Sequence, residues 1–171
     1  MLRRFCLLII TLSLSSLLWA SPEQAVKSLG IKLKDKGKPG ANYIYAVQNG
    51  NLLFLAGHIS VDADGNVIKG KLGDDMTTAQ GAHAARMAGI SILSTIRQQL
   101  GSLDRVDRLV KVTGMVNATA DYTEHSSVIN GFSDLMVEVF GEKGRHARSA
   151  VGMSSLPVGA AVEIEVILQI K

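Results

Sequence analysis

Cysteine is nearly absent from this chain, because Cys6 is the only one among 171 residues. It lies in the apolar amino-terminal segment, so a protein that loses its first twenty residues contains no thiol. Disulfides, thiolate nucleophiles and cysteine metal sites are then excluded together. Such a domain must be stabilised by its hydrophobic core, and a hydrophobic content of 47% is sufficient for one domain of this length.

Aromatic residues and net charge are also scarce. The chain has one Trp, three Tyr and four Phe, and its formal net charge is +3. Arg3 and Arg4 are two of the 18 basic residues, so a chain cut after residue 20 has nearly equal numbers of basic and acidic groups. Nucleic-acid binding requires a basic surface and stacking side chains. We therefore expect no nucleic-acid partner.

Conventional catalytic and metal motifs are missing. The sequence contains no GxSxG, no HExxH and no glycine-rich phosphate loop. The stretch 62–66 has the acidic residues of a calcium loop, but its glycine is misplaced and the closing glutamate is absent, which favours a hairpin turn. The four histidines share no ligand spacing: His58, His83, His125 and His146. No metal site is predicted.

Residues 1–20 have the pattern of a secretory signal. Arg3 and Arg4 precede a short apolar run at 5–18, the small residue Ala20 ends the segment, and polar residues follow. The run is short for a membrane span, which favours cleavage and a periplasmic or secreted protein without a membrane contact. An uncleaved membrane anchor is the alternative.

Three regions are expected: the signal at 1–20, a lead segment at 21–40 and one domain at 41–171. Lysines alternate through the lead segment, which favours a solvated entry loop. Strands are predicted at 43–47 and 52–56 around the Asn49-Gly50 turn, with a short strand at 67–68. Apolar spacing predicts helices over 77–100 and 122–140, each ended by a glycine.

Three further strands are predicted at 109–117, 148–153 and 161–170. In the first, Val110, Val112 and Val116 are expected on one face. Two helices, each with one apolar stripe, can pack on one face of a mixed sheet, so the predicted fold class is an α+β two-layer sandwich. The other sheet face would carry Tyr43, Thr113, Met115 and Ile167 beside Glu163 and Glu165. That mixture indicates a subunit interface containing a polar pocket.

Arg148 is the strongest candidate for a binding residue. An arginine facing a cleft can hold a carboxylate through two parallel hydrogen bonds, and a nearby glutamate can orient or deprotonate water. The alternative is a salt bridge between strands 148–153 and 161–170, taken as neighbours.

The stretch Gly144-Arg145-His146-Ala147-Arg148-Ser149-Ala150-Val151, with Leu156-Pro157 and Val162-Glu163-Ile164-Glu165, resembles the signature of the Rid/YjgF family. Asn42-Tyr43, Leu55-Ala56-Gly57-His58 and Val128-Ile129-Asn130 agree with it. The resemblance implies a chorismate-mutase-like fold and a homotrimer with three inter-subunit clefts. It also implies cofactor-free hydrolysis of enamines or imines to 2-keto acids and ammonia.

By position in the family, Arg148 holds the substrate carboxylate and Glu163 orients the attacking water. The same resemblance implies that Tyr43 and Asn130 shape the cleft and that His58 contributes to substrate binding. The chain departs from the family at Ala56, His58 and Ala150, where serine, glutamine and cysteine are common. Two other functions are therefore considered: a non-catalytic trimer that binds small carboxylates, and an endoribonuclease, which the near-neutral charge disfavours.

Overall fold

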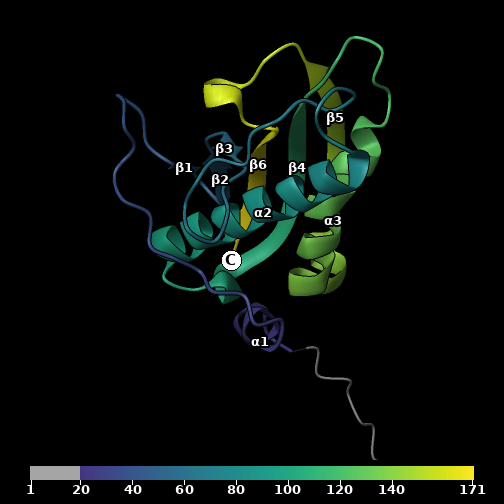
Figure 1. The fold of residues 1–171 in the computed structure, drawn as a ribbon. Helices are drawn as coiled ribbons and strands as arrows, with labels where there is room; N and C mark the ends of the chain where they lie inside the picture. Colours follow the sequence, from purple (N-terminus) through teal and green to yellow (C-terminus); the bar gives the residue numbers. More distant parts are fainter. Residues whose placement is uncertain (1–19) are drawn as a thin grey trace, which may run out of the picture.

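The computed structural model describes residues 20–171, so the predicted signal lies almost entirely outside the described residues. The chain forms one mixed sheet with its two long helices on the same side (Figure 1). The elements follow in this order: α1 (Pro22–Ser28), β1 (Ala46–Asn49), β2 (Leu52–Leu55), β3 (His58–Ile59), α2 (Thr78–Leu100), η1 (Leu103–Arg105), β4 (Val106–Asn117), α3 (His125–Phe140), η2 (Gly141–Gly144), β5 (Ala147–Met153), η3 (Pro157–Gly159) and β6 (Val162–Ile170). The predicted two-layer α+β fold is confirmed.

The sheet has the order β1-β2-β6-β4-β5, and β3 pairs separately with β6. The β4–β5 pair is parallel and the other pairs are antiparallel. The strand β4 therefore separates β5 from β6. The expectation that strands 148–153 and 161–170 are neighbours is wrong, which matters for the site described below.

Both long helices begin and end close to the predicted positions. Thr77 and Gln80 form a capping box at the start of α2, and Gly101 ends it with φ 81°. The helix α3 begins at His125, three residues later than predicted. The two helices approach closely at Gly131, where a Cβ atom would lie 1.9 Å from the backbone oxygen of Ala82.

The helix-side face of the sheet is a continuous apolar surface. Alternate residues of β6 are buried there, and β4 contributes Val112 and Val116. Val110 does not join them: its side chain is 37% exposed, whereas Leu109 is fully buried. A register irregularity between Leu109 and Lys111 reverses the alternation at this point, which a strict period of two could not predict.

The lead segment is more structured than the solvated loop we expected. Ser21 and Gln24 form a capping box that starts α1, whose Val26 is buried. The following residues lie along α2, where the side chain of Gln98 bonds both backbone groups of Lys36. Ile31 and Leu33, which alternate with the lysines, pack against the core. The alternating lysines suggested a solvated loop, although the residues between them form an apolar set that packs on the core.

The short strand predicted at 67–68 is only an isolated bridge between Val61 and Val67. The strand β3 at His58–Ile59 takes its place beside β6. Among residues 20–171, no helix is both long enough and apolar enough to span a membrane.

Candidate functional site

Arg148 lies on the edge strand β5 and points to the helix side of the sheet. It is in register with Val112 of β4, which is in turn paired with Val166 of β6, and both valines are buried under the helices. Residues directly opposite each other in neighbouring strands point to the same face. The arginine therefore extends from the sheet edge toward α3.

The acceptors that hold the Arg148 guanidinium all belong to α3. Its Nη1 donates to Asn130 Oδ1 at 2.9 Å and to Ser133 Oγ at 3.0 Å, and its Nη2 donates to the Ser126 carbonyl at 3.5 Å. Two hydrogens of Nη1 are thus used. Within the part of the chain that the structure describes, Nε has no hydrogen bond, so the Nε–Nη2 edge remains for a planar anion such as a carboxylate.

Glu163 lies on the opposite face of the sheet. It pairs with Met115 of β4 and with Ile59 of β3. Its carboxylate covers Gly57, where an added Cβ atom would lie 2.0 Å from Glu163 Oε1. Burial, and then the nearby Glu165 carboxylate, raise the pKa of Glu163 above its usual value. A carboxylate of this kind is suited to accept a proton from water.

Arg148 and Glu163 therefore point to opposite faces of one sheet and cannot contact the same small molecule within one chain. The alternative of a salt bridge is also wrong. The ion pairs among residues 20–171 are Arg86–Glu138, Lys143–Asp107 and Arg145–Glu142, and none includes Arg148. Arg148 and Glu163 are therefore each available to a ligand on a different face of the sheet.

The other predicted site residues are placed differently. Asn130 contacts Arg148 directly, as described above. Tyr43 is half exposed before β1, and its ring lies 6.0 Å from that of Tyr45 in an edge-to-face arrangement. Asn130 therefore lies with Arg148 on the helix side of the sheet.

His58 does not line a cleft with its side chain. It is 2% exposed, and its Nδ1 donates to the Ala56 carbonyl at 2.7 Å, so Nε2 accepts from Thr95 Oγ1 at 2.8 Å. Burial, reinforced by the positive charge of Lys36, lowers the pKa of His58 to about 4. This histidine joins the β2–β3 connection to α2 and is structural.

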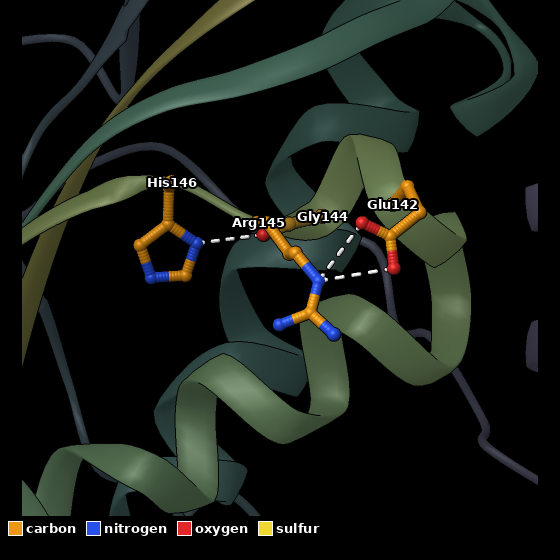
Figure 2. A network of polar contacts seen from close by, with 4 residues as sticks. All are labelled: Glu142, Gly144, Arg145 and His146. Atoms are coloured by element: carbon orange, nitrogen blue, oxygen red, sulfur yellow. Dashed lines mark hydrogen bonds and ion pairs between the residues drawn. The ribbon is translucent and has the colours of Figure 1, made fainter.

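Sequence reasoning missed Ser133, Gly57 and His146. Ser133 is three residues after Asn130 in a helix, so the two share a face, and that spacing could have identified it. His146 Nε2 lies 3.1 Å from Ser133 Oγ. Its Nδ1 donates to the Gly144 carbonyl at 2.7 Å, as Figure 2 shows. Nothing in the sequence indicated that Gly57 lies beneath Glu163.

A polar hollow of about 220 Å³ lies beside the arginine. Its lining comes from α3 and from the segment that leads into β5: Ser133, Asp134, Val137, Arg145, His146 and Arg148. A second hollow of about 110 Å³ on the open face includes Phe54, Lys111 and Glu165. Among the described residues, no group of three or more His, Cys, Asp or Glu side chains could hold a metal ion.

The chain is similar to proteins of one family over most of its length. A family model described as "YjgF/chorismate_mutase-like, putative endoribonuclease" matches residues 23–168. Protein TCP17 of Trypanosoma cruzi is 42% identical over 146 residues, which cover 85% of this chain and 91% of TCP17.

Two solved structures share the fold. Atu1372 of Agrobacterium tumefaciens, of unknown function, has a TM-score of 0.80 and 37% identity, covering 88% of this chain and 94% of its own. A structure from Shewanella oneidensis, titled a putative endoribonuclease, has a TM-score of 0.84 and 26% identity, covering 88% of this chain and 100% of its own. The family model covers most of the chain, including both Arg148 and Glu163. The chain therefore belongs to the Rid/YjgF family.

Proposed function

We propose that this protein is a homotrimeric hydrolase that deaminates reactive 2-imino acids and their enamine tautomers. The observation that carries the proposal is the Arg148 guanidinium: α3 holds it through Nη1, while along its Nε–Nη2 edge Nε has no hydrogen bond among residues 20–171 and Nη2 has only a 3.5 Å bond to the Ser126 carbonyl. That edge matches the two oxygens of a substrate carboxylate. Membership of the Rid/YjgF family supports the same assignment.

In the proposed reaction, Glu163 orients a water molecule and accepts its proton as the oxygen attacks the imine carbon. The proton then passes to the substrate nitrogen, which gives a carbinolamine. Glu163 next accepts the proton of the new hydroxyl group and passes it to the same nitrogen as the carbon–nitrogen bond breaks, so the products are a 2-keto acid and ammonia. Water supplies the oxygen, so the reaction requires no redox change and no cofactor. The raised pKa of Glu163 supports its role as the proton acceptor.

The opposite positions of Arg148 and Glu163 support a site shared between subunits. The open sheet face carries Val47 and Phe54, which are 50% and 37% exposed, together with the partly buried Ile167. An apolar face with a polar hollow is suited to a subunit contact. We propose that it receives the β5 edge of the next subunit, so that Arg148 of one chain faces Glu163 of another.

Complementation tests this arrangement. Arg148→Ala and Glu163→Gln are each expected to lack activity on a freshly generated 2-imino acid, measured as 2-keto acid release above the spontaneous rate. After the two variants are unfolded together and refolded, random mixing should restore about a quarter of the intact clefts. Recovery near that level supports a shared site. An inactive mixture of correct trimers would show that no cleft combines the two groups.

The wild type and Arg148→Ala also distinguish the deaminase from a non-catalytic carboxylate binder. Wild-type protein that binds 2-ketobutyrate saturably but never accelerates imine hydrolysis is a non-catalytic carboxylate binder. Hydrolysis above the spontaneous rate that is lost in Arg148→Ala supports the deaminase.

We also propose that the protein is exported and cleaved after Ala20, on the basis of the sequence pattern of residues 1–20. Intact-mass measurement of the periplasmic protein tests this. A species that still begins at Met1 and sediments with membranes would contradict it.

A further inference from the structure

The Arg148 guanidinium is connected to the backbone of η2 by a chain of hydrogen bonds that the proposed reaction does not use. Arg148 Nη1 donates to Ser133 Oγ at 3.0 Å, and Ser133 Oγ lies 3.1 Å from His146 Nε2. His146 Nδ1 lies 2.7 Å from the Gly144 carbonyl oxygen. Four groups from α3, β5 and the segment between them are thus linked in one line.

The chemistry of the two ends fixes the direction of this chain. A carbonyl oxygen only accepts, so His146 Nδ1 carries the proton that it donates to Gly144. In the neutral ring, Nε2 is then an acceptor and receives the hydroxyl hydrogen of Ser133. The lone pairs of Ser133 Oγ are left for Arg148. The serine hydroxyl therefore has one defined orientation, set by the histidine.

The carbonyl at the start of the chain is itself fixed. A Cβ atom at Gly144 would lie 2.2 Å from the Met136 carbonyl oxygen, so η2 is packed directly on the end of α3. The ring of Phe132 meets the His146 ring edge-on, with centroids 5.8 Å apart. Both contacts restrict the position of the imidazole ring, which can then hold the Ser133 hydroxyl in one orientation.

We propose that His146 is a positioning residue: its neutral ring, acting through the Ser133 hydroxyl, holds the Arg148 guanidinium so that the Nε–Nη2 edge faces the substrate carboxylate. This inference rests on the proposed function for its ligand. The hydrogen-bond chain itself belongs to the folded protein and can be tested without any substrate.

The surroundings of His146 indicate how pH acts on this chain. The charged and polar groups that line the same hollow are Arg148 on β5, Asp134 and Ser133 on α3, and Arg145, which follows η2. Arg145 is paired with Glu142, and Figure 2 shows its side chain turned away from the His146 ring toward that carboxylate. Burial first, and then the Arg148 charge, lower the pKa of His146, while its bond to Gly144 opposes them. Acid therefore adds a positive charge beside Arg148 and removes the acceptor for Ser133.

Two substitutions test the two nitrogen atoms of the His146 ring separately. His146→Asn can keep a donor for Gly144 at the Nδ1 position but cannot reach Ser133. His146→Gln places an acceptor near the Nε2 position and does not titrate. The first should behave like Ser133→Ala, and the second should behave like the wild type at neutral pH.

The first measurement is the ¹⁵N NMR signal of the Arg148 side chain in the protein without ligand. Rotation of its Nη groups should become faster in His146→Asn and in Ser133→Ala, but not in His146→Gln. An unchanged Arg148 signal in both His146→Asn and Ser133→Ala, with native melting temperatures, would overturn the proposal. Ser133→Ala removes the bond to Arg148 itself, so it shows what complete loss of this support looks like, whereas His146→Asn tests the histidine; a native His146→Asn protein with an unchanged Arg148 signal is by itself enough to overturn the proposal.

The second measurement is the affinity for 2-ketobutyrate, determined by calorimetry. We expect it to fall about three- to tenfold in His146→Asn and in Ser133→Ala, and to fall no further in the double variant, because one hydrogen-bond chain is lost in each case. In the wild type the affinity should decrease on acidification below the His146 pKa, and His146→Gln should lack this decrease. Fully additive losses, or an identical acid decrease in His146→Gln, would contradict the chain. If the wild type binds no 2-keto acid, the proposed function fails, and the NMR result alone decides the role of His146.

Discussion

The two faces of the sheet use the same strands but are completed differently. On the helix side, Val112, Ile164 and Leu168 are fully buried by residues of the same chain. On the open side, Phe54 is 37% exposed and lies in register with Ile167 at the centre of the sheet. One alternating sequence thus encodes both a core that is buried within a single chain and an apolar face that the chain leaves exposed. The candidate site has one half on each of these two faces.

Adjacent residues of β6 give the largest contrast. Leu168→Ala removes fully buried methyl groups and should reduce the free energy of unfolding by about 2–5 kcal/mol, measured by urea denaturation. Ile167→Asp should leave a folded chain by circular dichroism but reduce the assembly to monomers in light scattering. Leu29→Asp, at an exposed apolar position of the lead segment, is the control. A trimer that survives Ile167→Asp would show that the open face is not the interface.

The substitution Arg148→Ala tests the helix-side half of the site. It should weaken 2-keto acid binding on the order of a hundredfold, because a bidentate contact in a partly desolvated cleft contributes about 2–4 kcal/mol. Arg148→Lys should recover little, since a point charge cannot reproduce the planar fork. Calorimetry measures both. Unchanged affinity in Arg148→Ala would make the arginine structural.

Acid should destabilise the helix side through His58. Its pKa is about 4 in the folded protein and about 6.5 in an unfolded chain, so the unfolded state binds the extra proton first as the pH falls. The free energy of unfolding should therefore fall between those two pH values, by at most about 3 kcal/mol. Denaturation curves of His58→Gln, which cannot titrate, should lack this part of the pH dependence. A parallel pH dependence in both proteins would show that other groups cause the loss.

A smaller effect is expected at Gly57, beneath the open-face half of the site. Gly57→Ala forces the Glu163 carboxylate to move, because the new Cβ atom would lie 2.0 Å from its Oε1. A displaced catalytic group should lower turnover by about tenfold, while the affinity for the 2-keto acid stays within about twofold. Gly40→Ala, which has no neighbour within 4 Å, is the control. Equal turnover in the two variants would argue against a role for Glu163.

The regular elements were predictable because their local signals agree. Thr77, Gly101 and the buried stripe of α3 all lie where periodicity and capping place them. The failures came from interactions between distant residues. The irregularity at Val110 depends on pairing with β6, and the burial of Ile31 and Leu33 depends on α2.

The geometry of the candidate site could not be predicted from the sequence. Arg148 and Glu163 were singled out by their chemistry and Asn130 by resemblance, but no local pattern shows that β4 separates β5 from β6. Sheet order is a property of the whole fold, so the opposite directions of Arg148 and Glu163 appeared only in the structure. His58 was placed at the cleft by its position in the family motif, and its burial against Thr95 depends on the contact between the β2–β3 connection and α2.

The position of α1 determines where an attachment to the amino terminus can be tolerated. Glu23 of this helix bonds the backbone of Leu103, and its own backbone N–H donates to Asp104, so residue 21 enters the domain beside η1 and α3 (Figure 1). This end of the chain lies with the helix layer, away from the apolar surface of the sheet. A purification tag or a surface linker placed before Ser21 should therefore leave the open sheet face free to contact neighbouring subunits.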